Sequence, residues 1–205
     1  MDYNQLATEE SIKKTREALE ERGFHAEVVN SKEEALEKIK ALIPAGATVM
    51  NGASVTLEEI GYQEYLREGT HQWNDLHAGV TAESDPLKRA ELRKKAINSE
   101  YYLGSVHAVA ETGEIVIASN TGSQLPHVVF TSPNVILVVS TKKITPTLEE
   151  AFKRLEEHVV PLEDEHMKQL YGSGTMHSKT VILRHENPNM KRNVLILFVK
   201  ENLGF

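Results

Sequence analysis

In the first third of the chain, the spacing of hydrophobic and polar positions alternates between a pattern typical of a helix and one typical of a strand. Apolar residues recur at helical spacing in residues 5–22 and 32–43. Each of these segments is followed by a short apolar run typical of a strand, at 24–29 and 47–50. A third helix is expected from about Leu57. Helix, strand, helix, strand, helix is the order that a parallel sheet covered by helices produces.

Capping signals indicate where several helices begin. A hydroxyl residue lies three positions before a carboxylate, the pattern of a capping box, at Ser31/Glu34, Thr56/Glu59 and Thr147/Glu150. Asp85-Pro86 predicts a helix that continues to about Ile97, because proline is favoured at the first helical position. The helix after Thr147 is expected to end near Glu157. Residues 69–83 have no clear period and are expected to be irregular.

The second half of the chain is richer in strands. Residues 101–110 and 114–118 flank a tight bend and predict an antiparallel hairpin. Residues 134–140 are almost continuously apolar, which is typical of a central strand buried on both faces. Two last strands, 180–183 and 194–200, are expected to pair with each other in antiparallel fashion. The pattern therefore predicts one mixed α/β domain spanning residues 1–205.

Composition narrows the function classes. The 205 residues carry a net charge of −7, which argues against nucleic acid as a partner, because phosphate binding needs clustered cations. Cysteine is absent, which excludes disulfides, a thiol nucleophile and thiolate-held iron–sulfur clusters within this chain. No apolar run reaches the about 18 residues of a membrane span, and the first residues are polar. A cytoplasmic protein is expected.

The first candidate site is the loop between the strand at 47–50 and the following helix. Asn51, Gly52, Ser54 and Thr56 bring free backbone N–H groups and hydroxyls to the end of a strand, a place that suits a carboxylate or a phosphate. The alternative is that Ser54 and Thr56 only cap the helix. No complete phosphate-loop or dinucleotide motif is present, so the cofactor stays unknown.

The second candidate is the bend Glu111-Thr112-Gly113. A carboxylate held by a tight turn at the end of a strand can act as a base, or as a nucleophile toward an activated acyl group. The alternative is an ordinary hairpin turn with a solvated glutamate.

The third candidate is the loop 119–127, which contains Thr121, Gly122 and His127. Its hydroxyls and backbone N–H groups can bind an anion, and the histidine can donate a proton. The alternative is a plain surface loop. Elsewhere the histidines lack the spacing of a metal motif, so no metal site is expected.

Four segments, taken in order, resemble the lactate-utilisation (LUD) domain family. The match spans residues 10–160 and is expected to extend over the whole chain. The four segments read Ser54-x-Thr56-x-Glu58-Glu59-Ile60-Gly61, Ala108-x-Ala110-Glu111-Thr112-Gly113-x-Ile115, Leu125-Pro126, and Lys143-Ile144-x-Pro146-Thr147-Leu148-Glu149-Glu150-Ala151. Near the C-terminus, residues 172–179 lack the proline and the Asp-Glu pair of many members.

The resemblance implies a three-layer α/β/α sandwich with a mainly parallel sheet and antiparallel additions, the fold of sugar-phosphate isomerases, glucosamine-phosphate deaminases and acyl-CoA transferases. It also implies site positions, at Ser54, Thr56, Glu59, Glu111, Thr112 and Gly113. The bend at Glu111 is similar to the place where some coenzyme A transferases of this fold keep a nucleophilic glutamate.

Three functions follow as expectations. The first is a cluster-free accessory component for the use of lactate or a similar small 2-hydroxy acid, working with iron–sulfur partner proteins. The second is a free-standing enzyme on a sugar phosphate or an acyl-CoA, and the third is a ligand-sensing module without chemistry. Each binds a small anionic metabolite where the segments around Ser54 and Glu111 are expected to meet. A homodimer is expected to use a sheet edge at residues 194–200.

Overall fold

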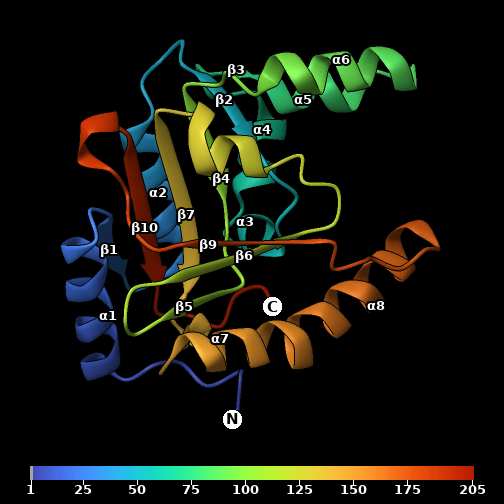
Figure 1. Cartoon of the computed structure of the whole chain (residues 1–205). Helices are drawn as coiled ribbons and strands as arrows, with labels where there is room; N and C mark the ends of the chain where they lie inside the picture. Colours follow the sequence, from blue (N-terminus) through green and yellow to red (C-terminus); the bar gives the residue numbers. More distant parts are fainter. Residues whose placement is uncertain (1) are drawn as a thin grey trace.

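Two β-sheets form the centre of the protein in the computed structural model, which describes residues 2–205 (Figure 1). The first sheet has six strands, all parallel. In spatial order they are β1 (His25–Val29), β10 (Asn193–Val199), β7 (Asn134–Ser140), β4 (Tyr101–Gly104), β2 (Thr48–Asn51) and β3 (Asn74–Asp75). The second sheet has four strands, β8 (Ile144–Thr145), β5 (Ala108–Ala110), β6 (Ile115–Ser119) and β9 (Lys179–Leu183). Antiparallel pairing occurs in this second sheet, between β5 and β6 and between β6 and β9.

Helices surround the sheets. The α-helices are α1 (Glu9–Glu21), α2 (Lys32–Leu42), α3 (Val55–Glu59), α4 (Tyr62–Glu68), α5 (Leu76–Ala82), α6 (Pro86–Ala96), α7 (Leu148–Arg154) and α8 (Val160–Tyr171). Shorter helical turns are η1 (His127–Thr131), η2 (Thr141–Lys143), η3 (Leu155–Val159) and η4 (Pro188–Met190). The turn η3 follows α7 directly and leads into α8, so that the three form one rod below the second sheet (Figure 1).

Packing of apolar side chains divides the molecule into layers. Helices α2 and α3 bury Ile39 and Leu57 against one face of the first sheet. On the other face, α1 and the second sheet pack together over Leu137 of β7. The outer face of the second sheet is covered by α7 and η3, through Ala151 and Leu155. The order of layers is therefore helix, parallel sheet, second sheet, helix.

Strand β7 shows why the sequence of a central strand in a parallel sheet is apolar at almost every position. Val135, Leu137 and Val139 point into the core on the side of α1, whereas Ile136 and Val138 point into the core on the side of α2. Both faces are dry, so every position favours an apolar residue. The prediction of a central strand at 134–140 is confirmed with the same bounds.

Local signals also located several helix starts correctly. The side chains of Ser31, Asp85 and Thr147 each accept a hydrogen bond from a backbone N–H in the first turn of the following helix. At α3 the cap is Ser54, whose Oγ accepts from the N–H of Leu57, and not Thr56 as predicted.

Four predictions about the elements are wrong. Residues 101–110 do not form one strand, because β4 lies in the first sheet and β5 in the second. Strands β9 and β10 lie in different sheets and do not pair, and β10 lies between β1 and β7, so it offers no edge for a homodimer. Residues 69–83 contain β3 and α5. The helical rod that begins with α7 continues to Tyr171.

In residues 2–205, no helix combines the length and the apolar character that crossing a membrane requires.

Candidate functional site

A cavity of about 340 Å³ opens at the carboxyl ends of β2 and β4. These strands are parallel and in register, with Asn51 opposite Leu103, so their ends meet at one edge of the sheet. The end of β6 and the loop after it form a second wall. Side chains of η3 and α8, among them Val159 and Met167, form an apolar third wall together with Phe205. Of the residues that sequence reasoning proposed, the cavity wall contains Asn51, Gly52, Ser54, Thr56, Thr121 and His127.

Gly52 is a glycine because the backbone passes very close to two side chains. A Cβ at this position would lie 2.5 Å from the hydroxyl of Tyr102 and 3.1 Å from Oε1 of Gln124. Any side chain would therefore push these two wall residues apart and change the shape of the cavity. Asn51, beside it, is buried and donates from Nδ2 to the carbonyl of Gly52.

Among the described residues of the cavity wall, Lys143 is the one lysine, and it lies in the turn η2 directly after β7. The residue is only 3% exposed. The Nζ atom donates to Oγ1 of Thr56 at 2.9 Å, to Oγ of Ser105 at 3.1 Å and to the carbonyl of Val106 at 3.3 Å. Thr56, proposed as a helix cap or an anion ligand, instead positions this amine.

The electrostatic surroundings of Lys143 oppose its charge. Within residues 2–205, no carboxylate lies within 4.0 Å of Nζ, the distance that defines an ion pair. Burial, followed by the positive charges of Arg154 and Lys142, holds the pKa of the lysine well below its usual range, and the more distant Glu59 offsets this only in part. A buried amine beside other cations is poised to bind an anion or to lose its proton.

His107 supplies a second polar group to the cavity wall. Its Nδ1 accepts a hydrogen bond from the backbone N–H of Ala118 at 3.0 Å, so the neutral ring carries its proton on Nε2. Burial, together with the charges of Lys143 and Arg154, lowers the pKa of His107 to about 3. At neutral pH the imidazole is therefore uncharged, and it can donate a hydrogen bond from Nε2 to a ligand.

His127 is a buried residue of the cavity wall. Its ring stacks on Tyr102 with centroids 4.7 Å apart, and Nδ1 lies 3.0 Å from Oγ of Ser132 and 3.2 Å from Oγ of Ser99. Burial lowers the pKa of His127 to about 4. The ring is thus a neutral part of the wall at pH 7, held by hydroxyls, and its geometry favours positioning of Tyr102 over proton donation.

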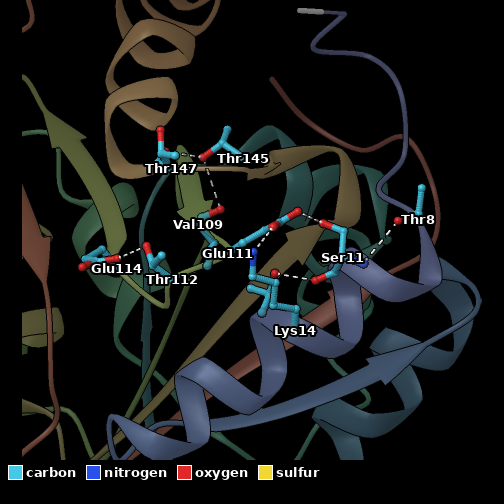
Figure 2. Close-up of polar contacts among 10 residues, drawn as sticks. Thr8, Ser11, Lys14, Val109, Glu111, Thr112, Glu114, Thr145 and Thr147 are labelled. Atoms are coloured by element: carbon cyan, nitrogen blue, oxygen red, sulfur yellow. Dashed lines mark hydrogen bonds and ion pairs between the residues drawn. The ribbon is translucent and has the colours of Figure 1, made fainter.

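Glu111 lies away from this cavity. Figure 2 shows its carboxylate directed toward α1, where Oε1 accepts from Oγ of Ser11 at 2.6 Å and Oε2 accepts from Nζ of Lys14 at 2.8 Å. Its backbone N–H donates to the carbonyl of Thr145. Burial raises the pKa of Glu111, but the hydrogen bonds from Lys14 and Ser11 outweigh it and hold the pKa below its usual range. The expectation that Ser54 and Glu111 share one crevice is wrong, because the chain continues from β4 into a different sheet before it reaches Glu111.

The other proposed positions stabilise turns outside the cavity wall. Thr112 donates to Glu114 at 2.5 Å, also visible in Figure 2. Gly113 has a φ of +92°, and a Cβ there would lie 2.9 Å from the carbonyl of Ala18 in α1. Gly122 has a φ of +82° in the loop after β6. Glu59 is exposed and accepts a hydrogen bond from the N–H of Gly204 at 2.6 Å.

Sequence reasoning missed Lys143 and His107 as site residues. In the sequence, Lys143 stands out only as the first residue of a segment that resembles the LUD family. A signal was present, since Lys142-Lys143 stands between the apolar strands β7 and β8, where a solvated pair of lysines is out of place. His107 falls within the single strand predicted for residues 101–110, whereas in the structure it lies between β4 and β5, where the chain crosses from one sheet to the other. Metal ligands are not gathered anywhere in the described part of the chain: no three His, Asp or Glu side chains there could hold one ion.

The fold and the cavity define an α/β protein with a cavity of mixed polar and apolar lining at the carboxyl edge of a parallel sheet. The sequence model of the LUD domain matches residues 12–190, and the chain belongs to the LUD domain family. A comparison with curated proteins found no match.

Two solved structures are similar to this chain, and the first of them agrees with it at the level of the fold. A DUF162 family protein from Deinococcus radiodurans is 12% identical and superposes with a TM-score of 0.55, over 95% of this chain and 98% of that one. Ribose 5-phosphate isomerase A from Methanocaldococcus jannaschii is 10% identical, with a TM-score of 0.38 over 84% of this chain and 96% of that one.

Proposed function

We propose that this LUD-domain protein binds a small anionic metabolite in the cavity at the ends of β2 and β4. The metabolite is lactate or a similar 2-hydroxy acid, and the protein, acting as one domain, is a cluster-free accessory component of its use. The observation that carries the proposal is the buried Lys143 amine in the cavity wall. It has no carboxylate partner among the described residues and lies beside hydroxyls of Thr56 and Ser105.

Charge complementarity supports an anion over a neutral ligand. Among the described residues of the cavity wall, Glu163 is the single carboxylate, whereas Lys143 and Arg93 are cationic and His107 offers an N–H donor. An anion beside Nζ would replace the missing counter-charge and favour the protonated ammonium. Affinity is therefore expected to fall as pH rises through the lowered pKa of Lys143, because the neutral amine offers no charge to the anion.

Size and polarity fit a small metabolite. A cavity of about 340 Å³ is at the lower end of the range for small-molecule sites. The walls at the ends of β2 and β6 supply hydroxyl and amide groups through Ser54, Ser119 and Gln124, whereas the wall of η3 and α8 is mainly apolar. A short acid with a hydroxyl and a methyl group matches both walls.

Glu111 does not support the second expectation, an enzyme acting on a sugar phosphate or an acyl-CoA through this carboxylate. The carboxylate is paired with Lys14 and Ser11 and is not part of the cavity wall. The iron–sulfur partner proteins remain part of the proposed accessory role, since a chain without cysteine cannot hold a thiolate-bound cluster itself.

The test is a thermal-shift titration with lactate and with lactamide, which has nearly the same shape but no charge. Lactate at about 100 times its Kd should stabilise the fold by roughly 2.7 kcal/mol, or about 5–10 °C in Tm, and lactamide should give no shift. Lys143→Met should weaken lactate binding by about tenfold or more, because it removes the positive charge beside the ligand. Lys142→Met, a change at the adjacent buried lysine outside the cavity wall, is the matched control and should weaken it less.

Equal shifts with lactate and lactamide, or an unchanged affinity in Lys143→Met, would contradict the proposed anion site. The accessory role is tested separately, by purifying the tagged protein from its native host during growth on lactate. Iron–sulfur proteins should co-purify, and deletion should slow growth on lactate. A protein that purifies alone and is dispensable for this growth would refute that role and leave the binding site standing.

A further inference from the structure

Lys143 combines three features that a nucleophilic amine needs. It lies in the wall of a cavity, it has no carboxylate partner among the described residues, and it is buried beside other cations. Lysines are activated as nucleophiles by such surroundings, because a desolvated amine near positive charge gives up its proton more easily. A lysine that only stabilised the fold would more commonly be paired with an acid.

The contacts of Nζ are compatible with both protonation states. As an ammonium, it donates to Thr56 Oγ1, Ser105 Oγ and the carbonyl of Val106. As a neutral amine, it keeps two N–H donors, and one of the hydroxyls can reverse and donate to its lone pair, since a hydroxyl both donates and accepts. The hydroxyls of Thr56 and Ser105 also lie where a proton must move when the amine reacts.

We propose that the Lys143 amine forms an imine with a 2-oxo acid held in the cavity. This inference rests on the proposed function, and it names the oxidised partner of the 2-hydroxy acid as the ligand that reacts. The chain would thus take up the product of a 2-hydroxy acid oxidation, a reaction carried out by another protein.

The reaction balances without an oxidant or a reductant. The lone pair of Nζ attacks the carbonyl carbon, one proton of the nitrogen passes to the carbonyl oxygen through the hydroxyl of Ser105 or Thr56, and a neutral carbinolamine forms. The second nitrogen proton then passes to the hydroxyl oxygen, the carbon–oxygen bond breaks and water leaves, and the nitrogen lone pair forms the carbon–nitrogen double bond. The carboxylate of the acid would be held by the Nε2–H of His107, which is uncharged at neutral pH and free to donate.

The experiment incubates the whole protein with pyruvate and cyanoborohydride at pH 7, then measures the intact mass and maps modified peptides. We expect one reduced pyruvate adduct per chain, located on Lys143 and formed about tenfold or more faster than on exposed lysines, since each unit of lowered pKa gives about tenfold more neutral amine. Lys143→Arg keeps the positive charge without the nucleophile and should abolish the adduct. Lys142→Arg should leave it unchanged.

Each result decides between the two proposals. An adduct spread over exposed lysines, or formed equally in Lys143→Arg, overturns the imine. Pyruvate that shifts the Tm without cyanoborohydride but forms no adduct also overturns the imine, and leaves the anion site intact. If neither pyruvate nor lactate shifts the Tm and no adduct forms, the proposed function fails as well. Peptide mapping of the unaltered protein gives the answer even if Lys143→Arg does not fold.

Discussion

The role of the Glu111 carboxylate can be tested directly. The sequence suggests a catalytic role, whereas in the structure the carboxylate stabilises the fold by contacting α1. The change is Glu111→Gln, which keeps the size and one acceptor oxygen but removes the negative charge. In the native protein this charge accepts hydrogen bonds from Ser11 at 2.6 Å and Lys14 at 2.8 Å, and so connects α1 to the end of β5. Glutamine can still accept from Ser11, but it cannot form an ion pair.

The magnitude follows from these two contacts. A hydrogen bond to a charged group contributes about 1 kcal/mol more than one between neutral groups, which is the expected loss at Ser11. The Lys14 side chain is 60% exposed, so solvent screens the ion pair and about 0.2–1 kcal/mol is lost there. Glu111→Gln should therefore lower the free energy of unfolding by about 1–2 kcal/mol at pH 7, or about 2–4 °C in Tm for each kcal/mol.

The pH dependence has a definite sign. The folded-state pKa of Glu111 lies below its usual range, although burial alone would raise it, because the hydrogen bonds from Lys14 and Ser11 favour the carboxylate. The stabilisation is complete above the pKa of an unfolded glutamate, about 4.3, and is lost as pH falls through the folded pKa. The difference between the wild type and Glu111→Gln should therefore shrink below about pH 4.

Urea unfolding at pH 7 and at pH 3.5 measures this difference, with Glu17→Gln as the control. Glu17 lies on the same helix, and its partner Lys13 is 3.8 Å away in an exposed pair, so its loss should leave the unfolding midpoint nearly unchanged. Lactate affinity should be unaltered in both variants. If Glu111→Gln unfolds like the wild type but no longer binds or turns over a ligand, the structural reading of this carboxylate is refuted.

Two further changes probe the packing that holds the second sheet in place. Leu137→Ala should lower the free energy of unfolding, measured with urea, by about 2–5 kcal/mol. The reason is that Leu137 is fully buried between the two sheets and alanine leaves a cavity. A decrease below about 1 kcal/mol would mean that this layer is loosely packed. Gly113→Ala should lower the Tm, measured by thermal denaturation, more than Gly46→Ala does. Both glycines have a positive φ, but only at Gly113 would the new Cβ meet backbone, the carbonyl of Ala18; equal costs would contradict the close approach of α1.

The elements that sequence reasoning predicted correctly are those with local causes. The run at β7 is apolar because both faces of that strand are covered, and the caps at Ser31, Asp85 and Thr147 act within one helical turn. The break between β4 and β5 has no such local cause. Residues 101–110 are suited to a strand throughout, and only the packing of α7 against β5 shows why the chain leaves the first sheet after Gly104.

Only part of the candidate site could be predicted from the sequence, because the other part depends on contacts between distant segments. The loop after β2 could be predicted, since the carboxyl end of a parallel strand is a site by topology, and Asn51, Gly52 and Ser54 indeed line the cavity. Glu111 follows a strand too, but that strand belongs to the second sheet, a fact that no periodicity contains. Lys143 comes from a segment 87 residues after Thr56, its partner, so only the folded chain could bring it to the site.

The strongest argument for a ligand is the buried positive charge in a protein whose net charge is −7. Arg154 is fully buried, donates to the carbonyl of His107, and leaves Nε and Nη2 without a partner among the described residues. Its charge, together with burial, lowers the pKa of Lys142, Lys143 and His107. Burying like charges together costs several kcal/mol and cannot be explained by stability. The anion that we propose beside Lys143 would supply a negative charge to these cations, and we infer that the arrangement is kept for that anion.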